Sequence, residues 1–253
     1  MRKLILIGAG LNKDLMTLKG LNKLKEADII LYDRLVDNSL LEAVNCEKIF
    51  VGKTPYRPGC SQCEINSLIE RALLENKTVV RIKGGDSSIY SRSLEEIEVA
   101  RKCNALIEIV PGVTAASQFV AKLETALTAR GISSGVIFIT GHKKDVELNE
   151  AYNWKAIVDL KMTIVVYMGI KNFMKILKLL VENGLHEKTP IAIGEKLDFE
   201  DENIIVSDVE NLLNSNFDIR FPAILLIGEV VKFSKFFKNS ITIKNERCIK
   251  CAN

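Results

Sequence analysis

The sequence lacks the features that mark several large classes of protein. None of its apolar runs approaches the ~20 residues that a membrane-spanning helix needs, so we expect no membrane partner. It has no Arg-rich block and no basic stripe interleaved with aromatic residues, so nucleic acid is not an expected partner either. Neither charge dominates, with 35 basic and 32 acidic side chains. An ordinary globular protein remains, and its 47% hydrophobic content can supply a sizeable core.

The start of the chain lacks a long apolar stretch. Residues 1–8 read MRKLILIG, which is apolar too briefly for a secretory signal and is typical of a buried strand. We therefore expect a cytoplasmic protein. Thiols are kept reduced in the cytoplasm, so we expect no structural disulfides.

Four of the six cysteines form two C-x-x-C pairs, Cys60/Cys63 and Cys248/Cys251. This pattern is a possible zinc or iron–sulfur signature. However, the two pairs lie nearly the whole chain apart, whereas modular zinc sites place theirs within a few tens of residues. Free surface thiols are the favoured interpretation, and we predict no metal ligands.

Short apolar runs alternate with longer stretches of helical period through the first half of the chain. The runs have the length and composition of strands buried on both faces, and the alternation indicates a parallel α/β sheet. Strands are predicted at 3–7, 28–32, 48–51, 78–82 and 107–110, and helices at 15–26, 38–44, 64–74 and 94–102.

After the break at Pro111-Gly112 the pattern changes. Closely spaced strands late in the chain indicate a mixed sheet with hairpins. Strands are predicted at 136–140, 163–167, 190–194, 203–206 and 223–228, and a helix at 172–182. We therefore predict an α/β protein of two α/β domains, residues 1–112 with a mostly parallel sheet and residues 113–238 with a mixed sheet, followed by a polar, Cys-containing tail at 239–253.

Four glycine-bearing turns follow predicted strands. They are Gly8-Ala9-Gly10, Gly84-Gly85-Asp86, the turn at 111–115 and Met168-Gly169. Ligands bind beyond the carboxyl ends of strands in open α/β sheets, where glycine lets the backbone approach them closely. The first turn lacks the third glycine of a dinucleotide fingerprint, and no P-loop is present. One such turn alone is usually structural, but four together predict a ligand cleft.

The order of these motifs resembles the tetrapyrrole methylases over roughly residues 3–232. The stretches YDRLV at 32–36 and VGK at 51–53 are similar to the uroporphyrinogen-III C-methyltransferase branch of that family. Further matching motifs are RIKGGD at 81–86, VPGVTAA at 110–116, TGH at 140–142, VYMG at 166–169 and IGEVV at 227–231.

This resemblance implies a homodimeric enzyme that binds S-adenosylmethionine in a cleft between its two domains. It implies two successive methylations of ring carbons, from uroporphyrinogen III through precorrin-1 to precorrin-2, with S-adenosylhomocysteine as the other product. Sirohaem, cobalamin and haem d1 lie on the branches that follow. The fold also serves other methyl acceptors, so fold alone does not fix the substrate. Because the chain starts at the first methylase strand, we expect it to lack dehydrogenase and ferrochelatase activities.

The resemblance also implies roles for five ionisable residues. Asp33 matches the proton acceptor and Lys53 the proton donor, although a capping Asp, a solvated Lys or an ion pair of the two would fit equally. Arg92, Glu95 and Arg130 match residues implicated in substrate binding or catalysis, and guanidinium groups suit a substrate with eight carboxylates. Surface ion pairing is the alternative for Arg92 and Glu95, whose spacing puts them on one helix face.

The implied cofactor contacts are mostly backbone. Met168 would pack near the methionine moiety, although a Met at a strand end is more often part of the core. We add that the Asp86 carboxylate would favour the cationic sulfonium over the neutral product. The predicted contacts are Gly10, Leu11, Gly84, Gly85, Asp86, Ile89, Thr114, Ala115, Met168, Ala192 and Ala223.

The chain departs from the family pattern in four places. After GAG at 8–10 the family runs PGDP, whereas LNKD at 11–14 is one residue short, and the family's ENG near the cofactor is EKL at 195–197. The family's GGDPFIFGRGGEE is GGDSSIYSRSLEE at 84–96, which replaces three glycines and a proline. A loop without those glycines must avoid positive φ or bear strain. The histidine of the family's LTHR is replaced by Ala129. A divergent working methyltransferase is the favoured interpretation, and the alternative is a paralogue that binds a tetrapyrrole or S-adenosylhomocysteine without catalysis or methylates a different precorrin.

Overall fold

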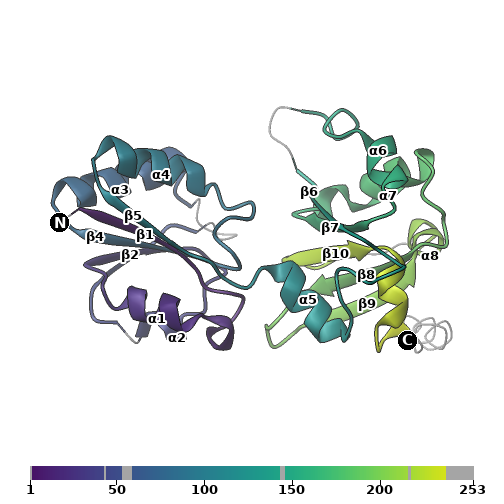
Figure 1. Ribbon diagram of the computed structural model, residues 1–253, viewed down its shortest axis with the longest axis horizontal. Coiled ribbons are helices and arrows are strands. Elements are labelled where there is room, and N and C mark those ends of the chain that lie inside the picture. Colours follow the sequence, from purple (N-terminus) through teal and green to yellow (C-terminus); the bar gives the residue numbers. More distant parts are fainter. Residues whose placement is uncertain (1, 43, 53–58, 143–145, 216–217, 238–253) are drawn as a thin grey trace, which may run out of the picture. The chain divides into compact units, whose positions relative to one another are not determined.

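The computed structural model describes residues 2–42, 44–52, 59–142, 146–215 and 218–237. The chain divides into two compact units, Met1–Ala115 and Ala116–Asn253. Each unit contains a five-stranded sheet of its own (Figure 1). Among the described residues, no helix has the length and apolar character needed to cross a membrane.

The sheet of the first unit has the order β3-β2-β4-β1-β5, and every neighbouring pair is parallel. All five carboxyl ends therefore lie at the same edge of the sheet. The strands are β1 (Lys3–Gly8), β2 (Ile29–Tyr32), β3 (Glu47–Phe50), β4 (Thr78–Lys83) and β5 (Leu106–Val110).

Helices cover both faces of this sheet, α1 and α2 on one and α3 and α4 on the other (Figure 1). The faces follow from the alternation of side chains along a strand. In β1, Leu4 and Leu6 pack with residues of α3 and α4, whereas Ile5 and Ile7 pack with residues of α1 and α2. The helices are α1 (Leu18–Leu24), α2 (Ser39–Glu42), α3 (Gln62–Leu74) and α4 (Ser93–Lys102).

The first helix is shorter than the predicted 15–26. A 3₁₀ turn, η1 (Lys13–Leu15), comes first, and α1 begins only at Leu18. The reason is a pair of capping side chains. Asn12 accepts from the amides at the start of η1, and Thr17 accepts from the Gly20 amide and so starts a new helix.

The sheet of the second unit is mixed, as predicted, in the order β6-β7-β10-β8-β9. Strands β6 and β7 are parallel, whereas β10 and β8 pair antiparallel with their neighbours. The strands are β6 (Val136–Thr140), β7 (Thr163–Tyr167), β8 (Pro190–Glu195), β9 (Asn203–Asp208) and β10 (Ala223–Ile227).

The helices of this part of the chain are mostly short. The sequence patterns missed α6 and α8, which have six and five residues. The α-helices are α5 (Ala115–Leu123), α6 (Trp154–Asp159), α7 (Phe173–Glu182) and α8 (Val209–Leu213), and the 3₁₀ helices are η2 (Ile170–Asn172) and η3 (Glu229–Phe233).

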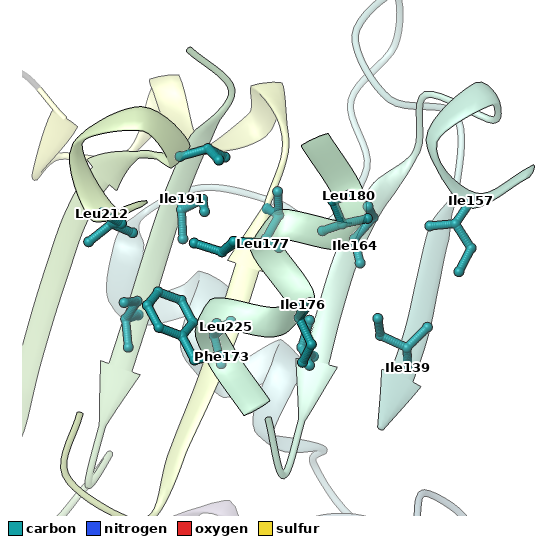
Figure 2. Packing of buried hydrophobic residues seen from close by; sticks show 14 of the residues in the cluster. Ile139, Ile157, Ile164, Phe173, Ile176, Leu177, Leu180, Ile191, Leu212 and Leu225 are labelled. Carbon is teal, nitrogen blue, oxygen red and sulfur yellow. The ribbon is translucent and has the colours of Figure 1, made fainter. Parts of the chain in front are cut away.

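Helix α7 packs on one face of the second sheet. Its buried residues Phe173, Ile176, Leu177 and Leu180 recur at helical spacing and point toward strand residues such as Leu225 (Figure 2). This single apolar stripe explains why the 172–182 pattern was readable in the sequence.

Candidate active site

Three glycine turns meet at the carboxyl edge of the first sheet. A Cβ on Gly112 would lie only 2.4 Å from the carbonyl oxygen of Gly85 and 2.5 Å from that of Gly8. Gly10 and Gly85 exchange two backbone hydrogen bonds of 3.1 and 2.7 Å. The ends of β1, β4 and β5 are thus joined backbone to backbone, which only glycine permits.

Gly85 is buried at this edge, but the turn leaves space beside it. Its φ is +72°, and a Cβ there would meet no atom closer than the Ala115 amide nitrogen at 3.8 Å. Leu11, Ile89 and Thr114 are half-buried in the neighbouring turns. Backbone flanked by half-buried side chains fits a cofactor held mainly by main-chain contacts. Eight of the predicted cofactor residues belong to these three turns: Gly10, Leu11, Gly84, Gly85, Asp86, Ile89, Thr114 and Ala115.

The Asp86 carboxylate ties two of the turns together. Its Oδ2 accepts from the Gly112 amide at 2.8 Å, and its Oδ1 accepts from the Ser88 amide at 2.7 Å. Burial opposes ionisation, but the hydrogen bonds from Ser88 and Gly112 outweigh it and lower the pKa of Asp86. Asp86 is therefore anionic and structural, and its predicted effect on a bound sulfonium stays a prediction.

Asp33 lies in the turn after β2, next to two of the glycines. A Cβ on Gly84 would lie 2.9 Å from the Leu35 Cβ, and one on Gly52 would lie 2.6 Å from the Arg34 amide nitrogen. The side chain of Asp33 is one-third exposed and pairs with Arg81, whose Nη2 is 2.7 Å from its Oδ1. The partner is therefore an arginine that the sequence analysis did not select, and Lys53 lies outside the described residues.

Three buried charged residues lie behind Asp33, and none of them was predicted from the sequence as a site residue. Arg81 and Lys83 of β4 are 3% and 2% exposed, and Glu96 of α4 is fully buried. Glu96 Oε1 lies 3.1 Å from Arg81 Nε, and Glu96 Oε2 lies 2.8 Å from Lys83 Nζ. Burial lowers the pKa of Lys83, and Glu96 opposes that effect. The sequence did contain a signal for Arg81 and Lys83, because two cations at alternate positions of a buried strand are unusual.

Arg92 and Glu95 form an ion pair at the start of α4. Arg92 Nε and Nη2 donate to the two carboxylate oxygens of Glu95 at 2.7 and 2.8 Å, and both side chains are exposed. The predicted common helix face is thus confirmed as a contact. A fork of this kind is also the geometry with which arginine binds a carboxylate of a ligand.

In the loop before α4, some residues have positive φ and others do not. Tyr90 and Arg92 have φ of +50° and +58°, although neither stands at a position where the family has glycine. The replaced positions Ser91, Ser93 and Leu94 have no positive φ. The hydroxyls of Ser91 and Ser93 both donate to the Ser87 carbonyl and so cross-link the loop. Loss of the glycines is therefore compatible with an ordered loop.

Four predicted site residues belong to the second unit. Arg130 is exposed in the turn between Ala129 and Ser133 and has no ion pair among the described residues. Met168 follows β7 with φ +51° and is 50% exposed, as a ligand contact requires. Ala223 begins β10, and Ala192 is fully buried in β8 between β9 and β10. Their roles stay predictions.

The second unit repeats the glycine contact on a smaller scale. A Cβ on Gly141, after β6, would lie 2.2 Å from the Gly169 Cα after the parallel β7. A cavity of about 390 Å³ opens beside this edge. It is lined by Gly141, His142, Val146, Glu147, Leu148, Asn172 and Lys175, none of which is a predicted site residue.

The first cysteine pair lies at the start of α3. Cys60 is half-buried, Cys63 is exposed, and both are free thiols. In the described part of the chain, no three His, Cys, Asp or Glu side chains form a group that could hold a metal ion. Cys248 and Cys251 lie outside the described residues.

Curated relatives share the sequence over almost the whole chain. The siroheme synthase of Baumannia cicadellinicola is 38% identical over 232 residues, which cover 90% of this chain and 50% of that protein. Siroheme synthase 1 of Cronobacter sakazakii is 34% identical over 251 residues, 97% of this chain and 53% of that protein. The chain thus spans about half the length of the curated relatives it matches.

Solved structures share the fold over about nine-tenths of this chain. The uroporphyrin III C-methyltransferase from Thermus thermophilus matches with a TM-score of 0.76 and 30% identity, covering 91% of this chain and 94% of that one. Its complex with S-adenyl homocysteine matches with a TM-score of 0.73 and 31% identity, covering 91% and 99%. A cobalt precorrin-4 methyltransferase matches with a TM-score of 0.78 and 29% identity, covering 91% and 96%.

The family model for Tetrapyrrole (Corrin/Porphyrin) Methylases matches residues 3–213. This match covers both sheets except β10, together with the glycine turns and the charged residues described above. The predicted family is therefore confirmed, and the chain belongs to the tetrapyrrole methylases.

Proposed function

We propose that the chain is an S-adenosylmethionine-dependent methyltransferase that converts uroporphyrinogen III, through precorrin-1, to precorrin-2. The observation that carries this proposal is the carboxyl edge of the first sheet. There, three glycine turns present bare backbone beside Asp33 and the Arg92–Glu95 pair. Siroheme synthases and a uroporphyrin III C-methyltransferase among the relatives support the same substrate.

The cofactor would be held chiefly by the turns that contain Gly10, Gly85 and Thr114. The structure of a relative with S-adenyl homocysteine supports a ligand of this class. When bound, the sulfonium supplies an activated methyl group to a ring carbon of the substrate. The chain's own task is to align that carbon with the methyl group, because a carbon nucleophile needs a close, collinear approach.

Asp33 would accept the proton that a pyrrole ring loses as its carbon is methylated. Its carboxylate is fixed by Arg81 and lies at the rim of the sheet, one-third exposed, so a substrate proton can reach it. Lys53 would be the proton donor. A positioned acid or base of this kind contributes about 10² to 10⁴ in rate.

Arg92 and Arg130 would bind carboxylates of the substrate. In the structure Glu95 occupies the fork of Arg92. A substrate carboxylate would replace Glu95 there, since both present the same two-oxygen face. The exposure of the pair makes this exchange inexpensive, because surface ion pairs contribute at most about 1 kcal/mol.

The test is incubation of the purified chain with uroporphyrinogen III and methyl-labelled S-adenosylmethionine. We expect two labelled methyl groups per tetrapyrrole, in step with formation of S-adenosylhomocysteine. Binding of S-adenosylhomocysteine without transfer would contradict the proposal and support a non-catalytic binding protein. Transfer to a different precorrin but not to uroporphyrinogen III would move the chain to another branch of the family.

We also propose that the protein acts as a homodimer, as the family resemblance implies, and that it is cytoplasmic. Sedimentation equilibrium of the purified chain checks the first part. A mass near twice 28.2 kDa is expected, and a mass of one chain at micromolar concentration would contradict it.

A further inference from the structure

We propose that Glu96 is a positioning residue that fixes two catalytic loops at once, the turn that carries Asp33 and the loop that carries Arg92. Glu96 would never touch the substrate and would act through Arg81 and Lys83. The catalytic part of this inference rests on the proposed function, but the coupling between the loops does not.

One buried carboxylate binds two cations from the same strand. Arg81 and Lys83 lie two residues apart in β4 and so face the same side of the sheet, where α4 packs. Glu96 meets each with a different oxygen, Arg81 Nε at 3.1 Å and Lys83 Nζ at 2.8 Å. Gln62 of α3 adds a contact of 3.4 Å to Oε1. The carboxylate is thus held from three sides.

The first branch leads to Asp33. The Arg81 guanidinium donates to the carbonyl oxygens of Leu31 and Ile82 at 3.3 and 3.1 Å, in addition to Glu96. These contacts fix its plane and leave Nη2 to hold Asp33 at 2.7 Å. The orientation of the proposed proton acceptor therefore depends on the bond between Glu96 and Arg81.

The second branch leads to the loop before α4. Lys83 Nζ donates to the Ser91 carbonyl at 2.5 Å, and Ser91 directly precedes Arg92. Arg92 has positive φ, a conformation that a non-glycine residue keeps only when its surroundings hold it. The bond from Lys83 is such a restraint, and Glu96 fixes the ammonium group that makes it.

Stability alone does not account for this arrangement. A buried ion cluster is generally no more stable than apolar side chains of similar volume. Apolar residues at positions 81, 83 and 96 would fill the same space, but they would leave Asp33 and the Ser91 carbonyl without their donors. What the charges supply beyond packing is a fixed link from the core to two separate loops.

The coupling is tested by hydrogen exchange of the full chain in three variants. Glu96→Gln should speed exchange in both loops by at least about tenfold, since local opening controls exchange. The Val36 amide reports the first loop, and the Ile89 and Glu95 amides report the second, because all three are hydrogen-bonded within their loops. Lys83→Met should speed only the second loop, and Arg81→Met only the first.

Glu108→Gln is the matched control. Glu108 belongs to the same unit and binds three lysines, but its cluster touches neither loop. It should leave exchange in both loops unchanged. If Glu96→Gln loosens only one loop, or if Lys83→Met loosens both, the inference is wrong. Should Glu96→Gln fail to fold, Lys83→Met and Arg81→Met still test the two branches, because each should loosen a different loop.

The catalytic part is tested by steady-state methyl transfer. A misplaced acceptor lowers turnover by about 10²-fold, so Glu96→Gln should reduce kcat to that extent. The rate is measured at saturating S-adenosylmethionine, because the second loop also carries the predicted cofactor contact Ile89. An unchanged kcat together with loosened loops would refute the catalytic role. Failure of the proposed function is a separate result, in which the unaltered chain transfers no methyl group while the exchange pattern still tests the coupling.

Discussion

The two sheets differ in where they bury charge. The first unit encloses Arg81, Lys83 and Glu96 together, and the cations reach from there to the carboxyl edge. In the described part of the second unit, the buried charged side chain is Glu195, which pairs with Arg220 at the surface. The half-exposed pair keeps part of its hydration and acts only locally. Burial of a whole charge cluster costs desolvation free energy, which a further role of the cluster must offset. The comparison therefore favours the first unit as the place of the proposed proton transfer.

The largest expected effect comes from adding a methyl group at the glycine contact of the first unit. Gly112→Ala places a methyl group 2.4 Å from the Gly85 carbonyl oxygen and should destabilise the protein by about 3 kcal/mol. Gly131→Ala in the second unit meets nothing within 4 Å and should lose only about 1 kcal/mol, from its positive φ. Urea denaturation measures both, and equal losses would show that the contact is not tight.

Asp33→Asn should have the next largest effect, on activity rather than on folding. The amide cannot accept a proton, so kcat should fall by about 10²-fold or more. Asp208→Asn is the counterpart in the second unit, because Asp208 caps α8 through a bond that an amide oxygen can also make. Methyl-transfer rates should separate the two variants, and a full rate for Asp33→Asn would remove Asp33 from the mechanism.

Arg130→Ala asks whether the second unit contributes to acceptor binding. Loss of one charge-assisted contact should raise the KM for the tetrapyrrole about tenfold. Calorimetry should find the affinity for S-adenosylhomocysteine changed by less than about twofold, or 0.4 kcal/mol. If the cofactor affinity falls as far as the substrate affinity, Arg130 does not act on the acceptor side.

The smallest effect concerns charge at the other end of the first sheet. Burial opposes ionisation of Glu108, but Lys3, Lys23 and Lys19 outweigh it and lower its pKa to about 2. Because the folded pKa lies below the ordinary 4.5, the stabilisation is complete above that pH and is lost as the pH falls toward 2. Glu108→Gln should therefore lose about 1 kcal/mol at pH 7 and approach the unaltered protein in acid. Activity at pH 7 should be unaffected.

Much of the fold could be predicted because apolar period and glycine turns are local signals. Strands of the first unit were readable as continuous apolar runs, and α7 as one apolar stripe. Helix boundaries were harder to predict, because a single capping side chain, Thr17, starts a new helix within the first helical pattern. Short helices such as α6 carry too few turns for a stripe to be visible.

The pairing of the buried charges could not be predicted, because the paired residues come from different elements. Arg81 and Glu96 are 15 residues apart and meet only once α4 has packed on β4. Glu95 and Glu96 are adjacent residues of the same type, so residue type alone does not distinguish their roles. Helical periodicity separates them, since Glu96 lies on the buried face with Ile97 and Ala100 while Glu95 faces solvent beside Arg92.

The central claim is that the glycine edge of the first unit holds the cofactor by its backbone, and Gly85→Leu tests it most directly. Gly85 and Gly131 have nearly equal φ, +72° and +75°, and neither has an atom within 3.7 Å of its would-be Cβ, so Gly131→Leu carries the same backbone strain. Calorimetry with S-adenosylhomocysteine should show at least about a 100-fold loss of affinity, or 2.7 kcal/mol, for Gly85→Leu only. Equal affinities in the two variants would contradict the account.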